Sequence, residues 1–336
     1  MLVVLLAALS MAFVLSLTLG SSAIPVARVV DALVGSGDAA DRAIIVSVRL
    51  PRAVTAILAG AALGIAGLQM QTLFRNPLAD PFALGVSAGA SLGVAIVVLG
   101  AGSAAADVFG STTGLVGDAL ITAAAIVGAA AVLALVLLVS ARIADATAVL
   151  ILGLMFGYAV SAGVTVLVGA GAPERLQQWA QWGLGSFTGV TWPRLRVFAP
   201  VTAIGLAVAA FTPKQLNALL LGDRYARSLG LTVLRTRFLT MAGASVLAAV
   251  VTAFCGPISF IGIAVPHLCR GLLGTADHRV VVPGVVLMGA VVALAAQVAS
   301  VLPGGGAVLP LNAVTALVGA PTVVVILLRR RNGSAV

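Results

Sequence analysis

Charged residues are scarce in this chain, making up 9% of its 336 residues against about 25% in an ordinary soluble domain. So few charges could not cover the surface of a soluble protein of this size, which excludes a soluble globular enzyme. Cysteine occurs only twice, which excludes a disulfide-rich scaffold. Hydrophobic residues instead make up 61% of the chain, and the mean hydropathy is +1.19. The composition therefore predicts an integral membrane protein.

The residues that carry catalysis and metal binding are also few. Lys214, the single lysine, follows Pro213, so the Gly-Lys-Ser/Thr end of a phosphate-binding loop is missing. The two histidines, His267 and His278, have no cluster of carboxylates near them in the sequence, so no metal site and no cofactor are expected. A nucleophile–base pair is missing as well, and we expect the chain itself not to be an enzyme. If ATP drives this protein, another chain hydrolyses it.

The net charge of +9 comes from 18 arginines and one lysine. Most of these basic residues stand singly between apolar runs, as in the loops of membrane proteins, and do not form a basic surface for nucleic acid. We therefore expect membrane lipid, and not nucleic acid, to surround much of the chain.

Apolar runs of about 20 residues, the length that crosses a bilayer as a helix, predict about ten transmembrane helices. The predicted spans are 2–19, 52–73, 82–101, 115–141, 146–169, 194–211, 237–255, 259–272, 281–301 and 309–328. The eighth span is too short to cross the bilayer, and Pro266 favours a short or broken helix packed against protein. The fold class is thus an all-α integral membrane protein, with residues 1–336 expected to form a single transmembrane domain.

The basic residues also predict the orientation. With ten spans and both termini in the cytoplasm, twelve Arg or Lys residues lie inside and seven outside, which agrees with the positive-inside rule. The inner loop 212–236 is the most polar part of the chain. Within it, Asp223 is expected to cap a short helix that ends at Gly230. The outer loop 170–193 begins a helix at Pro173, with Trp179 and Trp182 on one face.

Two sets of small residues recur at helical spacing inside the spans. They are Gly60, Gly64 and Gly67 in one span and Gly85, Gly89 and Gly93 in the next. Such faces permit close helix packing, and they also leave room for a passing solute. Acidic residues are absent from the centres of the spans, whereas a carrier of bare ions or protons normally keeps buried carboxylates. The lack of buried carboxylates therefore favours a solute that is already chelated when it arrives, or transport driven by energy from another subunit.

Several short motifs stand out along the chain. They are RLPR at 49–52, AGAALGIAGLQMQ at 59–71, RNPLADP at 75–81, LGVSAGA at 84–90, WGLGSF at 182–187, GPISFIG at 256–262, PHLCR at 266–270, DHR at 277–279, LPLN at 309–312 and GAP at 319–321. Together they resemble the motifs of FecCD-type permeases, which belong to binding-protein-dependent ABC importers of iron–siderophore complexes, haem or vitamin B12. The resemblance covers about positions 20–330.

The resemblance implies a permease subunit that dimerises with a second permease, identical or paralogous, in a bacterial inner membrane. Two ATPase subunits would bind inside and a substrate-binding protein outside. The coupling residues toward the ATPase would be Gly222, Asp223, Arg224, Ala226, Arg227, Leu229 and Gly230. The residues that dock the binding protein would be Arg49 and Arg52, which stand at the matching motif. Members can carry a further outer arginine that residues 301–306 lack, so docking would rest on this pair alone or involve other loops. The translocation path would be lined by Met155, Gly157 and Ser161.

The leading hypothesis is therefore transport of a ferric siderophore. Haem and cobalamin are alternatives within the same family. An ion-coupled secondary transporter and a membrane enzyme are alternatives of other classes; the lack of buried carboxylates argues against the first, and the lack of a nucleophile–base pair argues against the second.

Overall fold

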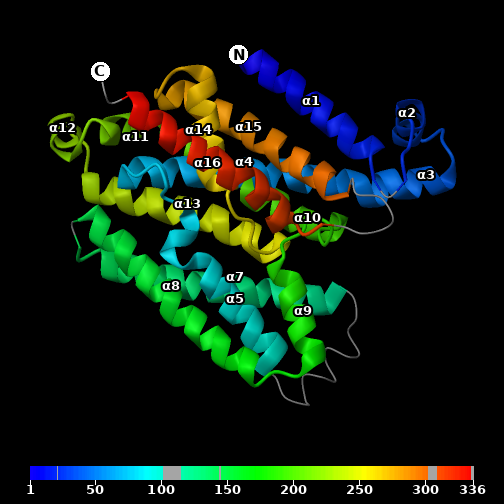
Figure 1. The fold of residues 1–336 in the computed structure, drawn as a ribbon, viewed down its shortest axis with the longest axis horizontal. Coiled ribbons are helices and arrows are strands. Elements are labelled where there is room, and N and C mark those ends of the chain that lie inside the picture. Colours follow the sequence, from blue (N-terminus) through cyan, green and yellow to red (C-terminus); the bar gives the residue numbers. More distant parts are fainter. Residues whose placement is uncertain (21, 101–114, 144, 302–308, 334–336) are drawn as a thin grey trace. The chain divides into compact units, whose positions relative to one another are not determined.

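The computed structural model describes the chain except for residues 21, 101–114, 144, 302–308 and 334–336 (Figure 1). Within the described residues the secondary structure is helical, without a strand. The predicted all-α class is therefore confirmed.

The helical elements follow one another with short connections. In the first half of the chain they are α1 (Leu2–Thr18), α2 (Val26–Val34), α3 (Ala39–Ile44), the π-helical η1 (Ile45–Arg49), α4 (Leu50–Phe74), the 3₁₀ turn η2 (Pro81–Leu84), α5 (Val86–Ala95), the π-helical η3 (Ile96–Gly100), α7 (Leu115–Ser140) and α8 (Ala146–Gly169). In the second half they are α9 (Pro173–Gly183), α10 (Trp192–Ala210), α11 (Pro213–Leu220), α12 (Asp223–Ser228), α13 (Val233–Cys255), α14 (Ile261–Leu273), α15 (His278–Val301) and α16 (Leu311–Gly333).

Six of the described helices are long and apolar enough to cross a membrane. They are Ala39–Phe74, Gly117–Ser140, Thr147–Gly169, Trp192–Ala210, Val233–Cys255 and His278–Val301. Four shorter apolar helices coincide with the remaining predicted spans: Leu2–Thr18, Val86–Leu99, Ile261–Leu273 and Leu311–Val324. The chain therefore crosses the membrane several times, and the count of ten spans stays a prediction. Residue 101, the predicted end of the third span, lies outside the described residues.

Helix α14 is short, as predicted. Its 13 residues rise about 20 Å, less than the roughly 30 Å of a bilayer core. Phe260 precedes it with a φ of 69°, a left-handed conformation that is uncommon for a bulky residue. Pro266 lies inside the helix, and most of its side chains are buried against protein.

The chain forms two compact units. The first comprises Met1–Leu68, Ser186–Asn217 and Ile258–Val336, and the second comprises Gln69–Gly185 and Ala218–Pro257. A single permease domain over 1–336 stays a prediction.

In the first unit, α1 packs along α15, and α14 packs against both α15 and α16 (Figure 1). Small residues allow α4 to approach α15 and α14 closely. A β-carbon on Gly60 would collide with the backbone of Gly289, and one on Gly67 would collide with the backbone of Gly262. In this part of the chain, the predicted role of the small-residue face in helix packing is confirmed.

In the second unit, α5 packs against α7 and α8. Gly89 and Gly93 of α5 are pressed against the backbone of Gly128 and Ala124 in α7. The second small-residue face thus also serves helix packing. Helix α9 begins at Pro173, as predicted, and none of its residues is buried.

Two local predictions for the inner loop differ in outcome. Gly230 ends α12 with a φ of 80°, and Leu231 N donates to Ala226 O at 3.0 Å, so the predicted stop is confirmed. Asp223 was predicted to cap α12, and this is wrong. Gly222 is the capping residue, because the carboxylate of Asp223 is engaged by arginines, as shown below. Helices α2 and α3 were not predicted.

Candidate functional site

The inner loop folds into two short helices, α11 and α12, joined by a turn at Leu221 and Gly222. Gly222 has a φ of 109°, which favours glycine at this position. Leu221 is 66% exposed and Leu229 is 61% exposed. Arg224 and Arg227 are also exposed. These side chains give the loop a mixed apolar and basic surface.

The predicted coupling residues differ in what they can contact. Arg224, Arg227, Leu229 and Gly230 are exposed, whereas Ala226 is fully buried. Ala226 packs α12 onto the subunit and is not available to a partner in this conformation. An aspartate at position 226 would therefore disturb folding before it tested docking. An open groove runs along the exposed side, lined by Arg75, Leu221, Gly222, Asp223, Arg224, Tyr225 and Ser228.

Asp223 holds two arginines from different helices. Its Oδ1 lies 2.7 Å from Arg75 Nη2, at the end of α4, and its Oδ2 lies 2.8 Å from Arg237 Nη2, in α13. Arg75 also donates from Nε to the carbonyl oxygen of Leu219 at 3.2 Å. Both carboxylate oxygens of Asp223 are thus used within the subunit.

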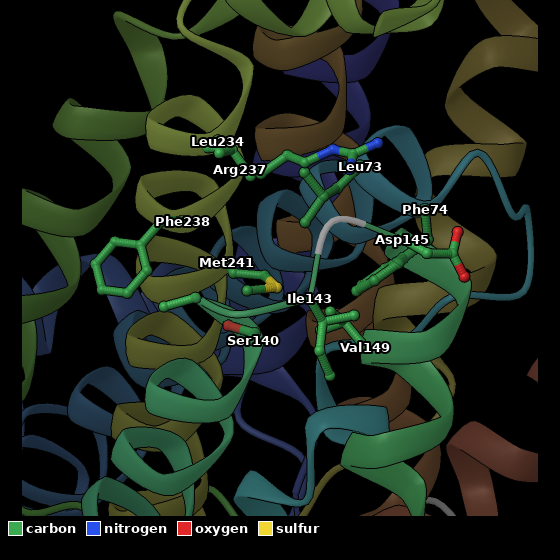
Figure 2. A pocket seen from close by; sticks show the side chains of 11 residues that line it. Leu73, Phe74, Ser140, Ile143, Asp145, Val149, Leu234, Arg237, Phe238 and Met241 are labelled. Atoms are coloured by element: carbon green, nitrogen blue, oxygen red, sulfur yellow. The ribbon is translucent and has the colours of Figure 1, made fainter.

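Arg237 lies along one edge of a cavity of about 220 Å³ (Figure 2). The rest of the lining is mainly apolar and includes Leu73, Phe238 and Met241. The aliphatic stem of Arg237 can pack against this apolar surface while its charged end meets Asp223. Its side chain is only 17% exposed, so its position is well fixed.

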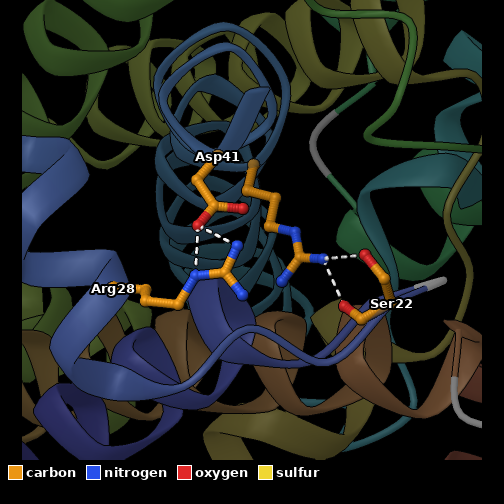
Figure 3. Close-up of polar contacts among 4 residues, drawn as sticks. Ser22, Arg28 and Asp41 are labelled. Carbon is orange, nitrogen blue, oxygen red and sulfur yellow. Dashed lines mark hydrogen bonds and ion pairs between the residues drawn. The ribbon is translucent and has the colours of Figure 1, made fainter. Parts of the chain in front are cut away.

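On the predicted outer side, Arg49 is an internal anchor. It is 5% exposed and donates from Nη1 to the carbonyl oxygens of Leu17 and Thr18 at 2.8 and 2.9 Å. Its Nη2 donates to the carbonyl oxygen of Ser22 at 2.5 Å and lies 3.4 Å from Ser22 Oγ. Beside it, Arg28 pairs with the buried Asp41 (Figure 3). Arg49 therefore ties the start of α4 to the end of α1.

Arg52 has a different environment from Arg49. It is half-buried and lines a cavity of about 210 Å³ together with Arg49, Ser16, Ser22 and Gln297. Arg52 Nε and Gln297 Oε1 are buried without a hydrogen-bond partner among the described residues. Of the two predicted docking arginines, Arg52 thus retains free hydrogen-bonding capacity.

The predicted path residues lie on α8, a helix that is mostly exposed in the isolated chain. Met155 is 55% exposed, Tyr158 is 68% exposed and Ser161 is also exposed. Gly157 instead faces Gly85, since a β-carbon there would lie 3.5 Å from Gly85 Cα. Met155 and Ser161 are therefore both exposed, whereas Gly157 belongs to a helix contact.

Sequence reasoning missed three residues that these sites contain: Arg75, Arg237 and Gln297. Arg75 and Asp223 are 148 positions apart, so no local pattern relates them. The sequence gives only one indication that Arg75 and Asp223 interact: both are charged residues beside apolar spans, and such residues need partners when they are buried.

Comparison with known proteins agrees with the helical permease architecture. The model of the FecCD transport family matches residues 8–329. The ferric enterobactin transport system permease protein FepD of Escherichia coli K12 is 35% identical over 332 residues, covering 97% of this chain and 94% of that protein. The vitamin B12 import system permease protein BtuC of Salmonella paratyphi A is 36% identical over 283 residues, covering 84% and 82%.

A solved structure described as an inward-facing conformation of a metal-chelate type ABC transporter is also similar. It superposes with a TM-score of 0.85 at 28% identity, and the match covers 98% of each chain. The motifs, the family model and the full-length relatives agree: the chain belongs to the FecCD transport family.

Proposed function

We propose that this chain is the permease subunit of an ABC importer that carries a ferric siderophore across the inner membrane of a bacterium. The observation that carries the proposal is the exposed basic and apolar surface of α12, on a chain whose relatives are permeases of ABC-type import systems. A partner ATPase supplies the energy, and a second permease subunit completes the path. Both termini lie in the cytoplasm in this proposal.

The coupling surface consists of Arg224, Arg227 and Leu229, with Gly222 and Gly230 setting the shape of the turns. Leu229 fills an apolar pocket on the ATPase, and the two arginines meet its carboxylates. Asp223 and Ala226 hold α12 in place behind this surface. An interface of this kind, with an apolar centre and charged rim, is typical of specific protein contacts.

The docking surface for the binding protein lies around Arg52. Arg49 supports it by fixing the start of α4, and Arg52 offers its guanidinium to a carboxylate of the partner. A direct test is the affinity of the reconstituted permease for its binding protein. Arg52→Glu should weaken binding by about fivefold, because an exposed ion pair contributes up to about 1 kcal/mol. Arg42→Glu, an equal charge change at an exposed outer residue, is the control, and equal effects of the two variants would argue against the docking role.

The translocation path lies along α8 and is lined by its exposed residues Met155 and Ser161. Gly157 lies in the contact between α8 and Gly85. A bulky chelate needs a wide and weakly binding route, and small uncharged side chains meet that need.

A ferric siderophore is the proposed substrate because a relative that matches 97% of this chain is a ferric enterobactin permease. Cobalamin is an alternative substrate, supported by the similarity to a vitamin B12 import permease. Haem is a third alternative. Uptake of a panel of ferric siderophores, haem and cobalamin by the complex in proteoliposomes decides between them. Uptake that follows an ion gradient without the ATPase would support a secondary transporter and contradict the proposal.

A further inference from the structure

The inner loop 212–236, which contains α11 and α12 and is called the coupling segment below, is held to the rest of the subunit at two places. The first is Asn217 in α11, whose carboxamide uses both of its ends. Its Nδ2 donates to Asp277 Oδ1 at 2.6 Å, and its Oδ1 accepts from the backbone nitrogen of His278 at 2.9 Å. His278 begins α15 and is 1% exposed. Asn217 thus fixes α11 to the start of a long apolar helix within the first compact unit.

The second place is Asp223 at the start of α12. Its two oxygens bind Arg75 at the end of α4 and Arg237 in α13. All three residues belong to the second compact unit. Each unit therefore contains its own side-chain clamp on the coupling segment.

The position of α12 depends on such contacts. It has six residues and a single buried side chain, Ala226. A helix of this length has no stability of its own, because nucleation costs more than so few hydrogen bonds return. The turn into α12 is also anchored by Arg75, which binds the carbonyl oxygen of Leu219. A force on α12 therefore reaches α4 and α13 through charged side chains.

We propose that Asn217 and Asp223 are positioning residues that transmit movement of the coupling segment to the transmembrane helices. Asn217 passes it to α15, and Asp223 passes it to α4 and α13. Neither residue needs to touch the ATPase for this role. The inference rests on the proposed function, in which the ATPase binds the exposed side of α12.

The test is the number of chelate molecules transported per ATP hydrolysed, measured with the complete complex in proteoliposomes. Asp223→Asn keeps the size of the side chain and removes the charge that holds two arginines. It should lower transport per ATP by about tenfold, which lies within the usual range of coupling between sites. Asp223→Glu keeps the charge and should retain most of the coupling. Asn217→Ala tests the other clamp and should also lower the ratio.

Copurification of the ATPase distinguishes positioning from direct binding. The ATPase should remain bound in Asp223→Asn and Asn217→Ala, while transport per ATP falls. Wild-type ratios in both variants would overturn the inference, and so would loss of the ATPase, because the residues would then be docking contacts. The proposed function has a separate test in Arg224→Glu combined with Arg227→Glu, which should release the ATPase. If that double variant keeps the ATPase, the proposed function fails whatever the clamp variants do.

Discussion

Gly67 of α4 lies so close to Gly262 of α14 that a β-carbon on Gly67 would collide with the Gly262 carbonyl oxygen. The contact brings two helix backbones together within the first compact unit. In a membrane, such close packing is a main source of helix association. Small-residue spacing in the sequence thus corresponds to a backbone contact in the fold.

Replacing Gly67 with alanine should therefore destabilise the subunit. The expected loss is about 1–3 kcal/mol, the usual cost of overpacking a tight core. Gly271→Ala is the control in the partner helix, since a β-carbon there meets nothing within 4 Å. It should be neutral or stabilise slightly, because alanine favours helix over glycine. Thermal unfolding in detergent measures both, and equal melting temperatures for the two variants would contradict the packing account.

Arg49→Lys should also destabilise the subunit despite keeping the charge. The lysine cannot reproduce the fork that reaches the carbonyl oxygens of Leu17, Thr18 and Ser22. Each buried carbonyl left unpaired costs about 1–3 kcal/mol. Arg42→Lys, at an exposed position, should have little effect. If Arg49→Lys unfolds at the wild-type temperature, the anchoring role of Arg49 is wrong.

The stability of the subunit should depend on pH because of Asp80, in the loop between α4 and α5. Burial raises the pKa of its carboxyl from 3.8 to about 6, against the opposing effect of the hydrogen bond from Phe82 N. A raised pKa in the folded state means that folding favours the neutral acid. The contribution of Asp80 to the stability of the fold is therefore fully present below about pH 4 and is lost as the pH rises through about 6.

The variant that tests this is Asp80→Asn, which keeps the oxygen that accepts from Phe82 N and cannot ionise. Its apparent melting temperature should exceed that of the wild type at pH 8 and equal it at pH 4. Asp80→Ala, which removes the acceptor as well, should be less stable than Asp80→Asn at both pH values. A constant difference between Asp80→Asn and the wild type from pH 4 to 8 would rule out the raised pKa.

Cysteine labelling can test the predicted path on α8. In a background that lacks Cys255 and Cys269, both of which are buried, Ser161→Cys should react with a water-soluble thiol reagent. Its reactivity should change when ATP binds to the complex, because the path opens and closes. Val164→Cys is the control three residues along the same helix, at a position that is 7% exposed, and it should stay unlabelled. Protection of Ser161→Cys in every state would place it in a helix contact.

The sequence was most informative where one physical rule decides the structure. Span 146–169 coincides with α8 because an apolar run between polar loops has one stable state in a bilayer. Gly230 was identified as a helix end because few other residues adopt its backbone conformation. Family motifs identified the chain as a FecCD member, which the comparisons confirm.

The side-chain partners could not be predicted in the same way. Asp223 suits a helix cap by its type, and only the distances to Arg75 and Arg237 show that its oxygens are already occupied. Arg49 and Arg52 are alike in the sequence, three positions apart, yet one anchors a backbone turn and the other lines a cavity. Such roles depend on contacts between distant segments, which local periodicity does not contain.

The most direct test of the central proposal is uptake of a ferric siderophore into proteoliposomes that contain this chain, its partner permease and the ATPase. The account predicts that uptake requires both the binding protein outside and ATP inside, and that collapsing ion gradients leaves it unchanged. Uptake that persists without the ATPase, or that stops when the gradients collapse while ATP remains, would contradict it.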